Sequence, residues 1–339
     1  MGLRAIAIGL VALTALPASV ARAESPAEFY KGKVVEMYIG YSVGGGYDVY
    51  ARLVARHLGK HIPGNPTVVP KNMEGAGSLR LANWLYKVGA KDGTVIGTIG
   101  RGVPFDPLLE RKGAQFEGNK FTYIGSANNE VSVCVSWYKT GVKTIQDAMK
   151  QQITVGGTGP AADTDQFPKI ANGLLGTKFK VISGYPGGNN AVLAMERGEV
   201  QGRCGWSWSS VKATHQAWID EKKINILVQM GLSKHPDLQN VPLITDLAKT
   251  DEERSILKLI FARQVMGRPF LAPPGVPADR VAALRTAFME TMKDPEFLAD
   301  AKKTKLEINP VNGEAVEKLA NEVYQTPKDI CQKAGALLK

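Results

Sequence analysis

Cysteine is scarce in this chain of 339 residues, which contains only Cys134, Cys204 and Cys331. Three dispersed cysteines exclude a disulfide-rich scaffold and a cysteine-ligated zinc site, because both need a larger and regularly spaced set. At most one bridge can form, and the sequence leaves open whether any pair is bridged. Histidine is also scarce, and His57 and His61 stand four apart without the glutamate of a zinc-protease helix. We therefore expect no metal site.

Long apolar runs are lacking except at the N-terminus. Arg4 precedes an uncharged run over residues 5–20, and Ala21-Arg22-Ala23 follows it. This order of basic, apolar and small residues is typical of a secretory signal peptide. A membrane anchor is the alternative, but the run falls short of the roughly 20 strongly apolar residues of a spanning helix. We expect a signal peptide over residues 1–23 and export to the periplasm.

The chain also lacks the interleaved aromatic and basic residues of RNA-binding modules, although its formal net charge is +10. Its lysines and arginines are scattered along the sequence. Solubility and the attraction of anionic ligands account for such an excess of positive charge. We therefore expect no nucleic-acid partner.

The part that remains after residue 23 is long enough for two domains, and its pattern of strands and helices occurs twice. The first unit has expected strands over 34–41, 67–70 and 94–99, and helices over 47–60 and 78–88. The second has strands over 153–155, 179–183, 200–203 and 224–228, and helices over 163–175 and 189–197. Later helices are expected over 278–292, 295–303 and 314–334. The alternation predicts an α/β fold with two lobes, each built on a parallel sheet.

Four glycine-rich turns, each between an expected strand and an expected helix, form the most informative pattern. They are Gly44-Gly45-Gly46-Tyr47-Asp48, Gly75-Ala76-Gly77-Ser78, Gly156-Gly157-Thr158-Gly159 and Tyr185-Pro186-Gly187-Gly188. A helix start leaves N–H groups unpaired and carries the positive end of the peptide dipole, so such a turn can hold an anion. Turns from two lobes could face each other across one cleft. The alternative is that the glycines only permit tight turns.

The first turn completes neither nucleotide-binding fingerprint. A P-loop has lysine and then serine or threonine after its glycines, whereas tyrosine and aspartate follow Gly46. A Rossmann site has an acid where Lys71 and Asn72 stand here. The Gly-Trp-Ser-Trp-Ser run over 205–209 lacks the second glycine of a nucleophile elbow. We therefore expect no cofactor, no catalytic residue and no enzyme activity.

Two arginines stand where a cleft would be lined. Arg101 follows the third expected strand and Arg203 follows a strand of the second unit. Guanidinium groups match carboxylates bidentately, and a surface ion pair is the alternative for each arginine. We favour Arg101 as the carboxylate contact because its lobe carries both early turns. Trp206 could wall the same cleft or lie in the core, and Asp48 is expected to cap its helix.

In these segments the chain resembles the substrate-binding receptors of tripartite tricarboxylate transporters, also called Bug proteins. The matching segments, in order, are Gly44 to Asp48, Glu74 to Gly77, Asp92 to Thr94, Tyr185 to Val200 and Ala272 to Pro277. The likeness covers nearly all of the expected mature chain, and it departs at Val43 and at Glu74, where the family has proline. It implies a two-lobed type II periplasmic binding protein with a ligand cleft between the lobes. Lobe 1 would comprise residues 24–127 and 260–339, and lobe 2 residues 128–259.

The resemblance implies an exported, non-enzymatic receptor that captures a small organic carboxylate and delivers it to a tripartite tricarboxylate-type membrane transporter. Its implied partners are the ligand and the integral membrane permease subunits, and the receptor itself is expected to be a monomer. The alternatives are a ligand-sensing receptor for a signalling membrane protein and an exported carboxylate-processing enzyme. By the likeness, Ser42, Gly45, Gly46, Asp48, Ala76 and Gly77 hold the proximal carboxylate, and Thr158, Gly159, Tyr185 and Gly188 close from the other lobe. The remaining expected ligand-binding residues are Tyr47, Ser78, Arg101, Arg203 and Trp206.

Overall fold

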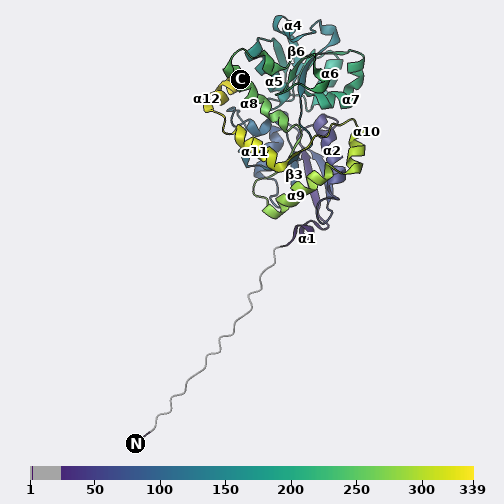
Figure 1. The fold of residues 1–339 in the computed structure, drawn as a ribbon, viewed down its shortest axis with the longest axis vertical. Helices are drawn as coiled ribbons and strands as arrows, with labels where there is room; N and C mark the ends of the chain where they lie inside the picture. The colour runs from purple at the N-terminus through teal and green to yellow at the C-terminus, as the bar shows by residue number, and fades with distance from the viewer. Residues whose placement is uncertain (1, 3–23) are drawn as a thin grey trace.

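The computed structural model describes residue 2 and residues 24–339, so the expected signal peptide lies outside the described residues. Two β-sheets, each flanked by helices, form two lobes that lie one above the other in Figure 1. Within the described part of the chain, no helix combines the length and the apolar character needed to cross a membrane.

The first lobe is built on a six-stranded sheet with the order β11-β4-β10-β3-β1-β2. Its strands are β1 (Val34–Ile39), β2 (Thr67–Asn72), β3 (Val95–Thr98), β4 (Thr122–Ser126), β10 (Pro269–Ala272) and β11 (Val311–Asn312). Its helices are α1 (Pro26–Tyr30), α2 (Gly46–Leu58), α3 (Leu79–Lys87), α9 (Ala278–Thr291), α10 (Pro295–Lys303) and α11 (Gly313–Val323). The expected parallel pairing of β1 with β2 and β3 is confirmed. The sheet is mixed, however, because β10 runs antiparallel to β3 and β4, and β11 runs antiparallel to β4.

The second lobe is built on a five-stranded sheet with the order β7-β6-β8-β5-β9. Its strands are β5 (Ser132–Trp137), β6 (Ile153–Gly156), β7 (Phe179–Ile182), β8 (Gly202–Ser207) and β9 (Ile224–Met230). Its helices are α4 (Ile145–Lys150), α5 (Asp163–Leu175), α6 (Gly188–Glu196), α7 (Trp208–Asp220), α8 (Asp251–Phe261) and α12 (Lys328–Leu337). Here too the sheet is mixed, since β5 runs antiparallel to both β8 and β9.

Hydrophobic periodicity explains how the first elements form and where they pack. Along β1, alternate residues Val35, Met37 and Ile39 are fully buried. On α2, Leu53 and Leu58 turn one face of the helix toward the same core. Each such buried side chain contributes about 1.5–3 kcal/mol, which fixes the helix on the sheet and directs its N-terminus toward the other lobe.

Two chain segments cross between the lobes side by side. The segment after β4 and the segment before β10 are joined by hydrogen bonds from Ala127 N to Arg268 O (3.1 Å) and from Gly267 N to Asn128 O (2.9 Å). Paired crossings of this kind form a narrow connection about which lobes can rotate.

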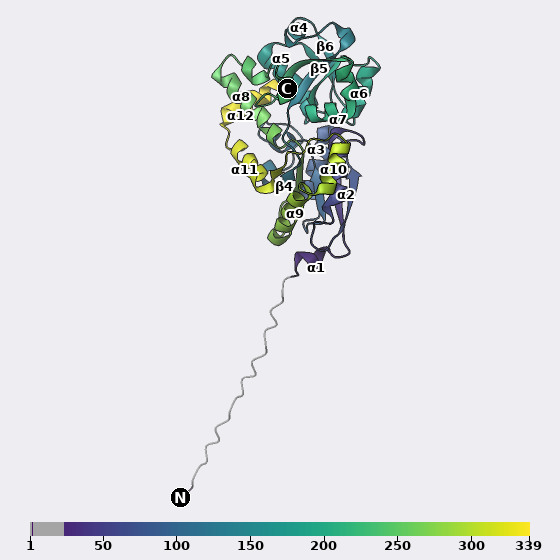
Figure 2. The same ribbon diagram turned by 45° about the vertical axis from the view of Figure 1, so that its right-hand side comes forward.

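The C-terminal region makes a third crossing that the sequence did not predict. The single helix expected over 314–334 is two helices, because α11 ends at Val323 and α12 begins at Lys328, after Pro327. Proline disfavours helical backbone in the residue before it and lacks an N–H, so it separates the two helices. Whereas α11 contacts β4 of the first lobe, α12 contacts α5 and α8 of the second, as Figure 2 shows. Residues 328–337, which the sequence had placed in the first lobe, therefore pack on α5 and α8 of the second lobe as well as beside Leu109, in the loop after β3 of the first.

One disulfide bridge is present in the described structure. Cys134 on β5 is bonded to Cys204 on β8 (S–S 2.02 Å), and the two strands are neighbours in the second sheet. Cys331 on α12 is a free, buried thiol. The pairing that the sequence left open is thus between the first two cysteines.

Candidate ligand-binding site

A cavity of ≈ 70 Å³ lies between the two lobes. Its walls come from the segments that follow the carboxyl ends of β1, β3 and β6 and from the end of β8, which is where open α/β sheets bind ligands. Four helices, α2, α5, α6 and α7, begin at this cavity. Their N-termini direct the positive ends of four helix dipoles toward one volume, an arrangement that favours an anion.

Part of the set expected from sequence lines this cavity. These residues are Gly45, Gly46, Tyr47, Arg101, Thr158, Gly188, Arg203 and Trp206. Tyr185 lies outside the lining and packs beside Gly156, where an added Cβ would be 3.4 Å from the tyrosine ring.

The second glycine turn lies beside the cavity and not in its wall. A Cβ on Gly77 would stand 2.7 Å from Ala162 N, and a Cβ on Gly159 would stand 2.5 Å from Gly77 N. Both glycines have positive φ, +69° and +134°. Ala76 and Ser78 also adopt positive φ, 49° and 82°. Gly77 and Gly159 thus form a close backbone contact between the lobes that side chains would prevent.

Ser42 and Asp48 lie beside the first turn but do not line the cavity. The Ser42 hydroxyl lies 3.1 Å from Oδ1 of Asn189 in the other lobe. Asp48 is 2% exposed, accepts a hydrogen bond from Gly44 N (2.9 Å) and pairs with Arg52 (2.9 Å). Asp48 is therefore not the helix cap that we expected: the N-cap residue of α2 is Gly45, and the carboxylate fastens the turn.

Arg101, which we favoured as the ligand contact, is held by the protein itself. Its Nε donates to Oδ2 of Asp163 (2.7 Å) and its Nη2 donates to Ser132 Oγ (2.7 Å). Burial alone would lower the pKa of Arg101, but Asp163 raises it above its ordinary value. Arg263 approaches the same carboxylate at 3.3 Å. The Arg101 charge is therefore compensated across the two lobes before any ligand binds.

Arg268, which stands just before β10, is a lining residue that sequence reasoning missed. Its Nη1 donates to Ser207 Oγ (3.0 Å) and its Nη2 donates to Ser210 Oγ (2.8 Å), both at the start of α7. Behind it, Glu130 lies 3.5 Å from Nη2. Because each serine oxygen accepts from Arg268, each hydroxyl proton is free to be donated into the cavity.

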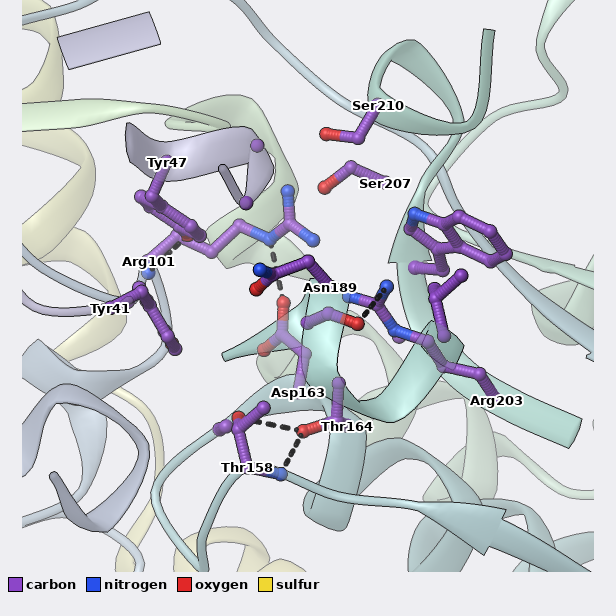
Figure 3. Close-up of a pocket in the computed structure, with 18 of the residues that line it drawn as sticks. Tyr41, Tyr47, Arg101, Thr158, Asp163, Thr164, Asn189, Arg203, Ser207 and Ser210 are labelled. Carbon is purple, nitrogen blue, oxygen red and sulfur yellow. Dashed lines mark hydrogen bonds and ion pairs between the residues drawn. The ribbon is translucent and has the colours of Figure 1, made fainter. Parts of the chain in front are cut away.

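Arg203 on β8 differs from the other cavity arginines. It is 9% exposed, its Nη1 donates to Gly188 O (3.0 Å), and its guanidinium lies 4.7 Å from the Trp206 ring. Among the described residues, no carboxylate lies within ion-pair distance of it, whereas Asp163 and Glu130 lie within that distance of Arg101 and Arg268. Its buried Nε has no hydrogen-bond partner, a feature that it shares with Arg268. Burial lowers the pKa of Arg203 to about 9, with Tyr41 opposing and Arg268 reinforcing the shift. Figure 3 shows Arg203 and Arg101 reaching toward the middle of the pocket from opposite sides.

Further polar lining residues escaped the sequence reasoning. They are Tyr41, Asp163, Thr164, Asn189, Ser207, Ser210, Thr214 and His215. Asn189 was within reach of that reasoning, because it directly follows the glycine that begins α6. Asp163 and Thr164 likewise begin an expected helix. For His215, in the middle of α7, the sequence carries no such signal.

His57 and His61, which were considered as metal ligands from the sequence, do not line this cavity and contact other residues. His57 Nε2 lies 3.0 Å from Asp300 and His61 Nε2 lies 2.8 Å from Asp294, both on or beside α10. Lys60 Nζ also lies 2.6 Å from Asp294. A lysine ammonium thus already supplies the positive charge that this carboxylate needs.

Comparison with solved structures places this architecture among binding proteins. The periplasmic binding protein BugD matches with a TM-score of 0.71 at 21% sequence identity, over 90% of this chain and 99% of that chain. The chain has the two-lobed fold of the periplasmic binding proteins. This binding-protein fold is shared with MatC from Rhodopseudomonas palustris, solved with bound malate (TM-score 0.68, 17% identity, 91% of this chain and 99% of MatC).

A curated relative extends the likeness to the sequence. The UPF0065 protein in the gbd 5′ region of Cupriavidus necator is 23% identical over 340 residues, which cover 98% of this chain and 95% of that protein. No family model matches the chain. The expected fold class and the resemblance to Bug-type receptors are confirmed.

Proposed function

We propose that this protein is an exported receptor that binds a small organic carboxylate between its two lobes. The observation that carries the proposal is Arg203, a buried guanidinium at the cavity that has no acidic partner among the described residues. Burying an unpaired charge is costly, whereas an ionised carboxylate would supply both the opposite charge and hydrogen-bond acceptors.

The charges around the cavity leave room for one anionic group. Three arginines and one aspartate line it. Asp163 compensates Arg101, and Glu130 lies behind Arg268. Arg203 remains, beside the N-terminus of α6. The helix N-termini strengthen the positive potential in the same volume.

The relatives support the same ligand class. MatC was solved with malate, and another R. palustris protein of the same fold (TM-score 0.67, 16% identity) was solved with adipate. Malate and adipate are both small carboxylates, so proteins of this fold can bind ligands of the proposed class. A receptor role, without chemical conversion of the ligand, agrees with the absence of a recognised catalytic set in the sequence.

Export and delivery to a membrane permease complete the proposal. The Cys134–Cys204 bridge is typical of oxidising compartments such as the periplasm, and the residues before Glu24 have the pattern of a signal peptide. The likeness to Bug-type receptors supports a tripartite tricarboxylate-type transporter as the recipient. This step would be supported if the tagged receptor co-purified with permease subunits in the presence of the ligand and did not co-purify with them in its absence.

A thermal-shift screen tests ligand binding directly. Residues 24–339 would be heated with propionate, succinate, malate, adipate or benzoate, and with succinamide as a control that keeps the shape but removes the charge. A ligand that binds only the folded state at 100 times its Kd adds about 2.7 kcal/mol to stability. We expect at least one carboxylate, and not succinamide, to raise the melting temperature. No shift with any of the five would contradict the proposal, and NMR detection of ligand conversion would favour the enzyme alternative.

A further inference from the structure

His215 interrupts helix α7 at the wall of the cavity. Its backbone angles, φ −138° and ψ 34°, are not helical, although the helix continues on both sides. The hydroxyl of Thr214 donates to Ser210 O (2.7 Å), and the same hydroxyl oxygen lies 2.6 Å from Nδ1 of His215. Because Thr214 has only one hydroxyl proton, we assign the ring hydrogen to Nδ1, which donates to Thr214. Nε2 is then the ring atom that is free to take up a proton.

The surroundings of His215 keep it neutral. Its ring packs against Trp206 (centroids 5.2 Å apart) and Trp218 (4.6 Å). Burial, and then the charge of Arg203, lower the pKa of His215 to about 4. Between pH 5 and 8 the imidazole of the ligand-free closed form is therefore uncharged.

The other titratable groups of the cavity do not change this balance. Arg203 on β8 is the charged group that acts on His215 directly. Tyr41, which follows β1, and Arg268, before β10, act on Arg203. Asp163 at the start of α5 is paired with Arg101, which follows β3. Among the described lining residues, no carboxylate is left over to stabilise a charged His215.

We propose that a carboxylate bound at Arg203 is also held by His215, which takes up a proton at Nε2 when the ligand binds. The proposal rests on the proposed function, because it concerns the same ligand in the same cavity. The ligand enters as the ionised carboxylate, and water or buffer gives a proton to the Nε2 lone pair. The new N–H then donates to the carboxylate, and no bond within the ligand is broken.

The charge of Arg203 explains why the two events are linked. A bound carboxylate cancels the repulsion that Arg203 exerts on a protonated imidazole, and it adds an attraction of its own. The pKa of His215 would then rise from about 4 toward its ordinary value of about 6.5, although burial of the ring continues to lower it. At pH 6.5, binding should therefore take up a measurable fraction of a proton per ligand.

Calorimetry in buffers of different ionisation enthalpy measures this uptake. The titration at pH 6.5 would use each of the five carboxylates that raises the melting temperature. We expect a measurable fractional uptake with the wild-type protein and close to none with His215→Gln, which retains Arg203. His61→Gln is the matched control, because His61 contacts Asp294 outside the cavity, and its uptake should equal that of the wild type.

NMR titration of the His215 ring gives a second, independent readout on the unmutated protein. We expect its pKa to rise by about one unit or more on addition of the same carboxylate. Tight binding without proton uptake, or uptake that persists in His215→Gln, would overturn this inference and leave the proposed function standing. Binding of none of the five carboxylates would overturn the proposed function and this inference together.

Discussion

Replacing Arg203 with glutamine should weaken ligand binding without weakening the fold. Glutamine keeps a polar side chain of similar reach but removes the charge. Without ligand, the substitution should remove little stabilising free energy. Arg203 makes one hydrogen bond, to Gly188 O, and has no acidic partner among the described residues. The main interaction that the substitution should remove is the proposed one between the Arg203 guanidinium and the ligand carboxylate.

The expected loss of affinity follows from that contact. A hydrogen bond to a charged group contributes about 1.5–3 kcal/mol. Its removal corresponds to a roughly 10- to 150-fold rise in Kd.

The expected effect on stability has the opposite sign. Burial lowers the pKa of Arg203 well below its ordinary value, to about 9, so the folded closed protein disfavours the charged form that prevails at pH 7. At about 1.36 kcal/mol per unit this penalty is roughly 5 kcal/mol at most, and less when the lobes open and water reaches the guanidinium. Arg203→Gln should therefore leave the melting temperature of the ligand-free protein unchanged or raise it.

Arg101→Gln is the matched comparison. This substitution leaves Asp163 without its partner at 2.7 Å, and breaking a buried pair costs about 3–5 kcal/mol. We expect a lower melting temperature for Arg101→Gln and not for Arg203→Gln. Arg197→Gln, on the surface of the same lobe as Arg203 with a side chain 70% exposed, controls for loss of charge. Wild-type affinity in Arg203→Gln, measured by calorimetry, would refute the assignment of Arg203 to the ligand.

Three further outcomes are expected. Gly77→Val should reduce affinity and leave circular dichroism unchanged, because its side chain would meet Ala162 as the lobes close; small-angle scattering with ligand should then show a larger radius than for the wild type. Burial raises the pKa of Asp106 to about 7, so the folded state favours the protonated form and stability should fall as pH rises from about 4 to 7. Asp106→Asn should flatten that dependence in denaturation curves and raise the melting temperature at pH 8, and a slope equal to the wild type's would contradict the reasoning. Replacing Cys134 and Cys204 together with alanine should cost about 2–4 kcal/mol in chemical denaturation, and an unchanged midpoint would show that the bridge does not restrict the unfolded chain.

The sequence predicted the local parts of the site well. The turn before α2 and the turn before α6 could be recognised because glycines, a preceding strand and a following helix are all adjacent in the chain. Gly45, Gly46 and Gly188 line the cavity accordingly. Whether they bind the ligand stays a prediction.

Pairings between distant residues could not be predicted in this way. Arg101 and Asp163 are 62 residues apart, and only the closed arrangement of two lobes makes them an ion pair. The same holds for Arg268, because β10, the strand that follows it, returns antiparallel into the first sheet after all five strands of the second sheet. A pattern of alternating strands and helices favours parallel neighbours and gives no sign of such a returning strand.

The C-terminal helices show a different limit. Their amphipathic pattern predicted helix over 314–334, but periodicity does not say which lobe receives the apolar face. Pro327 was the one local sign that the segment is divided.

The first and last helices of residues 24–339 belong to different lobes, and this has a practical consequence. Helix α1 contacts α9 at the base of the first lobe, whereas α12 contacts α5 and α8 on the second, so the two helices lie well apart in Figure 1. A hinge rotation that closes the cavity would change the separation between α1 and α12. Fluorescent donor and acceptor groups fused at these two positions would therefore report ligand capture as a change in energy transfer, without an insertion into either sheet. If the thermal-shift screen identifies a carboxylate ligand, the same two positions would make the protein a scaffold for an optical sensor of that ligand.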